Sequence, residues 1–179
     1  MPTNIEIKAK LRDRSAAEAA ADRLRTAGPE VIRQEDHFFK SSSGRLKLRI
    51  FGPESGELIR YERANTPGPR RSHYIIVRTA DPYTLLEILT AELGQIGTVS
   101  KMRTLYLIGQ TRVHLDRVEG LGEFLELEVV LRPEQSEAEG QNIAERLLQE
   151  FKIDARDLVS EAYIDLLVGR TGSAVEPEV

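Results

Sequence analysis

The sequence lacks several features that would each point to a class of protein. It contains no cysteine, which excludes disulfides, thiol catalysis and Cys-ligated zinc. No stretch approaches the roughly 20 apolar residues of a membrane span, and the N-terminus shows no signal-peptide pattern, so we expect a cytoplasmic protein that does not contact a membrane. The net charge of −4 argues against a nucleic-acid-binding protein.

Known phosphate-binding and zinc-binding motifs are missing as well. There is no Walker sequence and no GxGxxG, so any phosphate would have to be held by side chains. The three histidines are scattered, with no His-x-x-x-His pair, which argues against a zinc site. His114 is expected to form a hydrogen bond with Asp116.

What the sequence does contain is a repeated period-two alternation, which predicts strands. The segment 122–131 places aliphatic side chains on one face and Glu126 and Glu128 on the other. Seven other segments are predicted as strands, at residues 3–12, 34–39, 45–51, 57–63, 72–79, 98–109 and 112–116. Helices are expected at residues 15–27, 81–94, 136–151 and 160–168. Residues 65–71 are expected to form a loop, and residues 169–179 a disordered tail after a single domain of residues 1–168.

Short connections favour antiparallel neighbours and an α+β class. Eight strands are about the number that closes into a small barrel. Amphipathic helices would cover the aliphatic face from outside, leaving the ionic face inside. A solvent-exposed sheet face would give the same alternation.

The ionic face carries both signs of charge. Its acids are Glu6, Asp116, Glu126 and Glu128. Its bases are Lys8, Lys10, Arg12, Lys47, Arg49, Lys101, Arg103 and Arg112, together with either Arg60 or Arg63. The basic surplus indicates a polyanion, and the carboxylates indicate a hard divalent cation, Mg²⁺ or Mn²⁺. A triphosphate with its metal meets both demands.

These segments resemble the CYTH superfamily, the triphosphate tunnel metalloenzymes. The family's N-terminal ExExK strand stands here as Asn4-Ile5-Glu6-Ile7-Lys8. The other matching segments are Arg45–Arg49, Leu58–Arg63, Lys101–Arg103, His114–Asp116 and Glu126–Glu128. The resemblance implies an eight-stranded antiparallel tunnel that binds a triphosphate with Mg²⁺ or Mn²⁺. One position departs from the pattern, because Asn4 stands where the family has its first glutamate.

The resemblance also implies roles for individual residues. Metal ligands would be Glu6, Glu126, Glu128 and Asp116, the last of which would otherwise orient basic residues. Phosphates would be held by Lys8, Lys10, Lys47, Arg49, Arg63, Lys101, Arg103 and Arg112. Glu126 or Glu128 would position or deprotonate the nucleophile.

Three functions stay open on the sequence alone. Hydrolysis of an organic or inorganic triphosphate makes the smallest demand on the site. The alternative is a class IV adenylyl cyclase that makes cyclic AMP and pyrophosphate from ATP. A catalytically silent binder of nucleotide or polyphosphate is the third, for which Asn4 is the best argument. Dimerisation also stays open.

Overall fold

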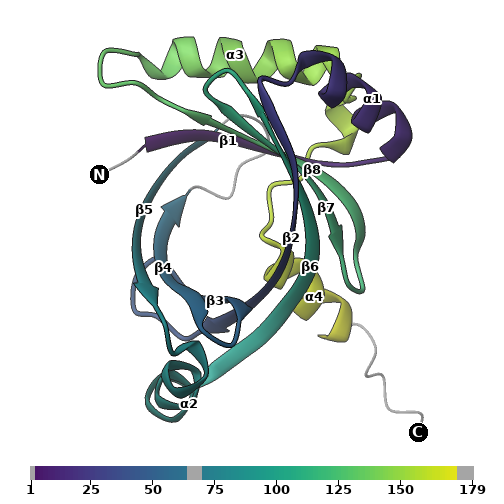
Figure 1. The fold of residues 1–179 in the computed structure, drawn as a ribbon. Helices are drawn as coiled ribbons and strands as arrows, with labels where there is room; N and C mark the ends of the chain where they lie inside the picture. Colours follow the sequence, from purple (N-terminus) through teal and green to yellow (C-terminus); the bar gives the residue numbers. More distant parts are fainter. Residues whose placement is uncertain (1–2, 64–69, 173–179) are drawn as a thin grey trace, which may run out of the picture.

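A computed structural model describes residues 3–63 and 70–172 of the chain. Eight antiparallel strands form a closed barrel in the order β1-β5-β4-β3-β2-β6-β7-β8 (Figure 1). They are β1 (Thr3–Lys10), β2 (Ala27–Phe39), β3 (Arg45–Gly52), β4 (Ser55–Arg63), β5 (Arg70–Thr79), β6 (Gln95–Ile108), β7 (Thr111–Val118) and β8 (Gly122–Val130). The predicted α+β class and barrel are confirmed.

Strand β1 closes the ring because it pairs with β8 on one edge and with β5 on the other. The β1–β8 register places Glu6 opposite Glu128 and Lys8 opposite Glu126. Since side chains alternate along each strand, these residues point into the barrel, while Ile5, Ile7 and their neighbours point outward.

Four helices pack against the barrel in the described residues. They are α1 (Arg14–Leu24), α2 (Pro82–Leu93), α3 (Glu137–Glu150) and α4 (Tyr163–Gly172), with a short 3₁₀ turn at Ala155–Asp157. Three of them, α1 to α3, cover its outer face. The apolar core therefore lies between helices and barrel. One cluster joins α1 and α3 to the strands through residues such as Ala21, Leu147, Leu115 and Leu127. Under α2, a second cluster contains Phe39, Leu48 and Ile50.

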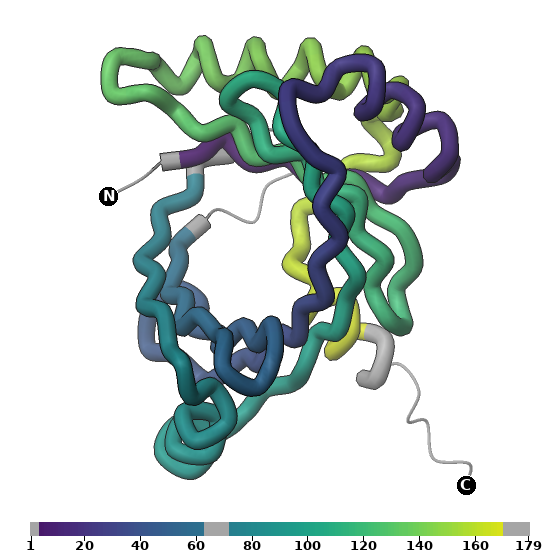
Figure 2. Tube along the Cα trace, in the orientation of Figure 1, coloured from purple at the N-terminus to yellow at the C-terminus, as the bar shows by residue number. Residues whose placement is uncertain are grey.

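Helix α4 has a different place from the other three. Its first residue, Tyr163, packs edge-on against Phe124 with ring centroids 4.9 Å apart. Before the helix, the Val159 N–H donates to the Lys8 carbonyl at 2.8 Å. The chain thus crosses one end of the barrel before α4 begins, along the yellow segment of Figure 2.

Several predicted boundaries need correction. Helix α1 begins at Arg14 and not at residue 15, because the Asp13 side chain caps it by accepting from the Ala16 N–H. It ends at Leu24 because the chain turns into β2 at Ala27. Strand β2 has 13 residues, far more than the predicted 34–39, because it pairs with most of β6.

Other boundaries hold or move slightly. Asp81 caps α2, and Ser136 and Glu139 form a capping box at α3, so both helices begin within a residue or two of their predicted starts at 81 and 136. Helix α4 reaches Gly172, four residues beyond the predicted domain end at residue 168, while residues 173–179 of the expected tail lie outside the described part. Of the predicted loop at 65–71, residues 70 and 71 belong to β5 and residues 65–69 are not described.

Candidate functional site: a charged cavity inside the barrel

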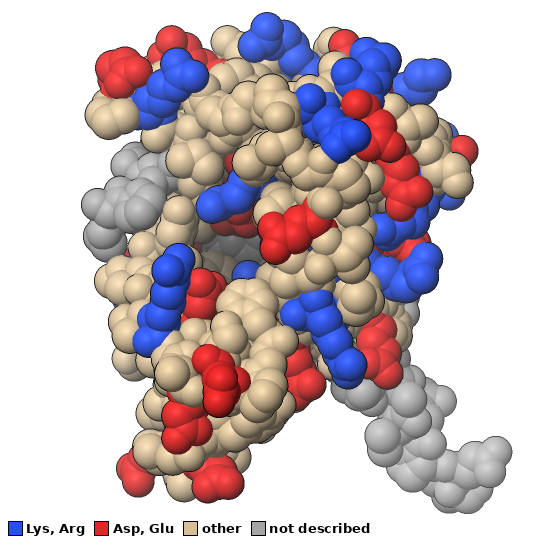
Figure 3. All heavy atoms as spheres, viewed as in Figure 1, with Lys and Arg blue, Asp and Glu red and all other residues tan. Residues whose placement is uncertain are grey.

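The inward faces of the strands enclose a cavity of about 410 Å³. Figure 3 shows the hollow from one side, with side chains of both charges around it. Among the described side chains, seven bases line it, namely Lys8, Lys47, Arg49, Arg78, Lys101, Arg103 and Arg112. Five acids do so too, namely Glu6, Asp36, Glu57, Glu126 and Glu128. The positive surplus is therefore smaller than the sequence indicates, because Asp36 and Glu57 also point inward.

One wall of the cavity is rich in carboxylates and lies on β8 and β1. Glu126 and Glu128 stand two residues apart on β8, and Glu6 faces Glu128 from β1. Glu126 accepts from Arg103 Nη2 at 3.1 Å, and Glu128 accepts from Arg112 Nε at 2.8 Å. Burial by itself raises the pKa of Glu126, but the charges of Lys8 and Arg103 outweigh it and hold that pKa well below its usual range. Glu126 is therefore an anion at neutral pH and cannot serve as a proton donor.

A second wall is cationic and comes from β3 and β6. It consists of Lys47 and Arg49 on β3 and of Lys101 and Arg103 on β6, and each of these side chains is no more than 13% exposed. Strand β2 lies between them and contributes Asp36, which contacts three of the four. Buried guanidinium and ammonium groups gathered on one wall provide the donors that bind phosphate oxygens.

Asp116 does not line the cavity, and its role as a metal ligand stays a prediction. It is fully buried and accepts from Arg103 Nε and Nη2 at 2.7 and 2.6 Å and from the Tyr163 hydroxyl at 3.0 Å. Burial raises its pKa, but the charge and hydrogen bonds of Arg103 lower it to about 2. These two hydrogen bonds fit the other role that the resemblance implies for Asp116, which is to orient Arg103.

Lys10 also lies outside the cavity lining. It is the last residue of β1 and is exposed, because the strand leaves the barrel at this end. Arg12, farther along the chain, pairs with Asp157 on the outside. Arg60 points outward as well, toward Ser43 and Glu62. The side chain of Arg63 lies outside the described part of the structure.

His114 lines the cavity but does not bind Asp116 as predicted. Its Nδ1 has no hydrogen-bond partner, and the oxygen Oε1 of Glu128 lies 4.0 Å away. Burial, followed by the charge of Arg103, lowers the pKa of His114 to about 4. The imidazole is therefore neutral at physiological pH.

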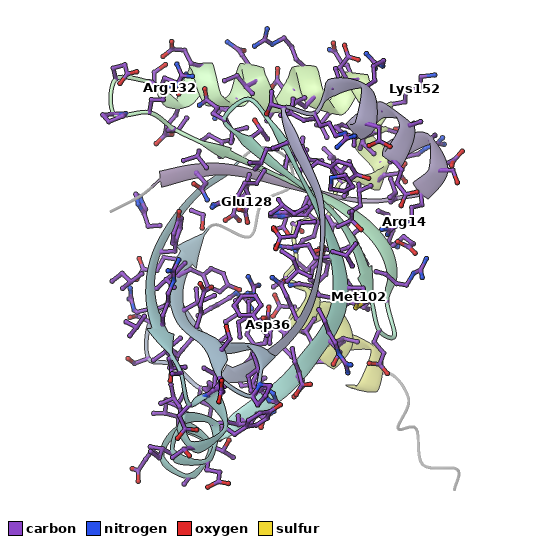
Figure 4. The ribbon with its side chains drawn as sticks, viewed as in Figure 1. Arg14, Asp36, Met102, Glu128, Arg132 and Lys152 are labelled. Carbon is purple, nitrogen blue, oxygen red and sulfur yellow. The ribbon has the colours of Figure 1, made fainter. Side chains whose placement is uncertain are left out.

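The sequence analysis missed Asp36, Glu57 and Tyr163, which all line the cavity. Asp36 and Glu128 both lie inside the ring in Figure 4. Asp36 belongs to a segment that alternates as Gln34, Asp36 and Phe38, so its inward direction was readable, but its cationic neighbours come from other strands. Tyr163 closes one end of the cavity, where its ring lies 4.0 Å from Lys8 Nζ. Nothing in the sequence around Tyr163 marks it.

The cavity suits a divalent cation that shares its coordination with a ligand. Within the described residues, no three His, Asp or Glu side chains lie close enough to hold a metal ion by themselves. Glu6, Glu126, Glu128 and the buried amide of Asn4 still place hard oxygen donors along one wall. Mg²⁺ typically binds through one or two carboxylates and takes its other oxygens from water and phosphate. The donor set therefore fits such an ion when phosphate is present.

Comparisons with solved structures find the same fold. The protein PH1012 of Pyrococcus horikoshii OT3 is 22% identical, with a TM-score of 0.79 over 91% of this chain and 98% of that one. A candidate adenylate cyclase of Vibrio parahaemolyticus is 17% identical, with a TM-score of 0.76 over 92% and 97%. A Hippeastrum protein, HpAC1, described as a candidate adenylyl cyclase with a dominant triphosphatase activity, is 20% identical, with a TM-score of 0.61 over 97% and 98%.

The helices and the sequence were also compared with known classes of protein. No helix among the described residues is both long and apolar enough to cross a membrane. None of the curated proteins compared with the chain matches it. The CYTH domain matches residues 2–163, which include every strand of the barrel and the closing Tyr163. The chain therefore belongs to the CYTH family.

Proposed function

We propose that this protein is a divalent-metal-dependent phosphohydrolase that acts on a triphosphate held inside the barrel. One observation carries the proposal. A wall of four buried cations, Lys47, Arg49, Lys101 and Arg103, lies beside a wall of carboxylates in one cavity. Phosphate oxygens would bind the first wall and the metal the second, which is the arrangement that transfer of a phosphoryl group requires.

The cation, Mg²⁺ or Mn²⁺, would be held by Glu6, by the amide oxygen of Asn4 and by one of the two glutamates of β8, Glu126 or Glu128. When bound, such an ion neutralises charge on the phosphate oxygens. The protein's cations stabilise the same charge from the opposite side, because they are fixed in place before the reaction and are shielded from water.

In hydrolysis, a water oxygen would form a bond to the terminal phosphorus while the bond from that phosphorus to the bridging oxygen breaks. The bridging oxygen leaves with the electron pair, and the water's proton must be accepted. Glu126 and Glu128 are ionised and face the cavity, so either can orient the water and accept that proton. A carboxylate that binds the metal is a poor base, so we assign the two roles to different glutamates.

The cavity has room for more than the phosphates. Its volume lies within the range of roughly 300–1,000 Å³ that is typical of small-molecule sites. Its lining includes apolar side chains, among them Phe51, Ile76 and Leu105, none of which can bind phosphate. An organic triphosphate, which has an apolar part as well as phosphates, fits a lining with both charged and apolar side chains better than inorganic triphosphate does. The same feature favours a second candidate, adenylyl cyclase activity, in which the ribose 3′-hydroxyl attacks the α-phosphorus and pyrophosphate leaves.

Product analysis tests the proposal. The full-length protein is incubated with ATP, thiamine triphosphate or inorganic triphosphate, each with Mg²⁺, Mn²⁺ or EDTA, and the products are separated. We expect metal-dependent release of orthophosphate, and faster release from at least one organic substrate than from inorganic triphosphate. Cyclic AMP with pyrophosphate would establish the cyclase instead. Retention of unchanged triphosphate in the presence of Mn²⁺ would refute hydrolysis and establish a binding protein.

A further inference from the structure

Three of the four cations on the basic wall share a single counter-ion. The Asp36 oxygen Oδ1 accepts from Arg49 Nε at 2.7 Å. Its Oδ2 accepts from Lys47 Nζ at 2.8 Å, Arg49 Nη2 at 2.9 Å and Lys101 Nζ at 3.2 Å. The Asp36 side chain is only 2% exposed, so these contacts are shielded from solvent.

Barrel topology makes this sharing feasible. Strand β2 lies between β3 and β6, and Asp36 pairs in register with Arg49 on one side and with Val99 on the other. Lys47 and Lys101 reach Asp36 from positions two residues away from Arg49 and Val99 on the two flanking strands. One carboxylate on the middle strand therefore fixes cations from both neighbours, and the cluster keeps two more positive charges than negative ones.

We propose that Asp36 is a positioning residue for the triphosphate: it fixes Lys47, Arg49 and Lys101 in a preformed array and favours the charged form of the two lysines. This inference rests on the proposed function of the cavity. The bound phosphates would contact the three cations and not Asp36, and they would supply the negative charge that the array still lacks.

The two lysines need Asp36 to favour their charged form, because both are buried. Burial and the charge of Arg49 lower the pKa of Lys47 to about 7, although Asp36 opposes them. Burial also lowers the pKa of Lys101, again against the influence of Asp36. The charges of Arg49, Arg103 and Asp116 also act on Lys101, and its Nζ lies 5.5 Å from the centre of the Tyr163 ring. Lys101 in turn lowers the pKa of Lys47, whose Nζ lies 5.6 Å from the rings of Phe38 and Tyr61. Without Asp36, both lysines would lose their protons at lower pH.

The proposal predicts a change in triphosphate affinity on removal of Asp36 that is opposite to the change expected from charge alone. Removal of a negative charge from an anion site should tighten anion binding if nothing else changes. If Asp36 positions and charges the lysines, its removal weakens binding instead, and most strongly above neutral pH. The direction of the change therefore separates a positioning residue from a mere counter-ion.

The experiment measures the affinity of the full-length protein for inorganic triphosphate by calorimetry between pH 6 and pH 9. Variants are Asp36→Asn, Asp36→Glu and, as a matched control, Glu35→Gln on the outer face of the same strand. We expect Asp36→Asn to weaken binding at least tenfold at pH 8 and less at pH 6, where the lysines regain protons. Glu35→Gln should change affinity less than twofold at either pH.

Asp36→Glu keeps the charge, so we expect it to preserve the pH dependence of the wild type even if it lowers affinity. It also serves as the test if Asp36→Asn does not fold. Equal or tighter binding by Asp36→Asn at pH 8, or a shift of the pH dependence by Asp36→Glu, would overturn the proposal. Because the assay measures binding, a wild type that binds triphosphate without cleaving it would refute the proposed hydrolysis and leave this inference testable.

Discussion

The pair formed by Arg103 and Asp116 gives the sharpest test of how the site is built. Arg103 is 6% exposed and Asp116 is not exposed at all, and two hydrogen bonds of 2.7 and 2.6 Å join them. Asp116→Asn would keep the shape of the side chain and remove its charge. Loss of one partner of a buried ion pair typically costs 3–5 kcal/mol, because the other charge stays buried without compensation.

The structure narrows the expected cost of the Asp116→Asn substitution. A fall in the pKa of Asp116 from 3.8 to about 2 corresponds to about 2 kcal/mol of net stabilisation of its ionised form, after the opposing effect of burial. The stranded guanidinium adds to that cost, but Glu126 remains 3.1 Å from Arg103 and offsets part of it. We therefore expect Asp116→Asn to lower the free energy of unfolding by about 3 kcal/mol at pH 7.

The same pKa fixes the pH dependence of this loss. Since the folded pKa of Asp116 is depressed, its contribution to stability is present in full above the unfolded value of 3.8 and disappears as the pH falls through about 2. The variant has no carboxylate to protonate. The difference in stability between wild type and variant should therefore be constant from pH 5 to pH 7 and shrink below pH 4.

Urea unfolding followed by far-UV circular dichroism measures both effects. The double variant Arg103→Met with Asp116→Leu is the matched control, because it removes both charges and should cost less than Asp116→Asn alone. A loss below about 1 kcal/mol, or a loss that appears only when Mn²⁺ is present, would refute the reasoning. The second result would support the role of Asp116 as a metal ligand.

Three further changes test the two walls of the cavity. Glu126→Gln should lower metal-dependent turnover by at least about 100-fold in a phosphate-release assay, with an unchanged circular dichroism spectrum; unchanged turnover would remove Glu126 from the site. Arg49→Ala should weaken triphosphate binding by about 1.5–3 kcal/mol in calorimetry, whereas Lys10→Ala, outside the cavity, should have no effect; equal effects would contradict the placement of Lys10. Asn4→Glu should tighten Mn²⁺ binding, measured by titration with triphosphate present, because it adds a charged ligand; no change would show that Asn4 does not reach the ion.

Period-two alternation, together with the number of strands and the resemblance to the CYTH superfamily, predicted the barrel and most of its interior. Each strand has one aliphatic face, and a helix can cover that face only from outside, so the ionic face had to point inward. This argument placed Lys8, Lys47, Arg49 and Glu126 correctly. Boundaries were harder, because the length of β2 is set by its pairing with β6 and not by its own alternation.

Neighbours across the barrel could not be predicted. The alternation of Gln34, Asp36 and Phe38 shows which side chains share a face, but it does not show that β2 lies between β3 and β6. That order decides that one carboxylate meets three cations. It follows from long-range pairing, in which β2 joins a strand that begins more than fifty residues later.

The sequence also could not predict how far along the barrel axis each inward-pointing side chain lies. Asp116 has the same parity as Arg112 and His114 on β7, yet only the last two line the cavity. Near Asp116, the interior is filled by Phe124 and by Tyr163, which reaches the barrel from the far end of the chain. Parity thus selects the residues that point inward, and the closing segment before α4 decides which of these contact a ligand and which serve only to hold the residues that do.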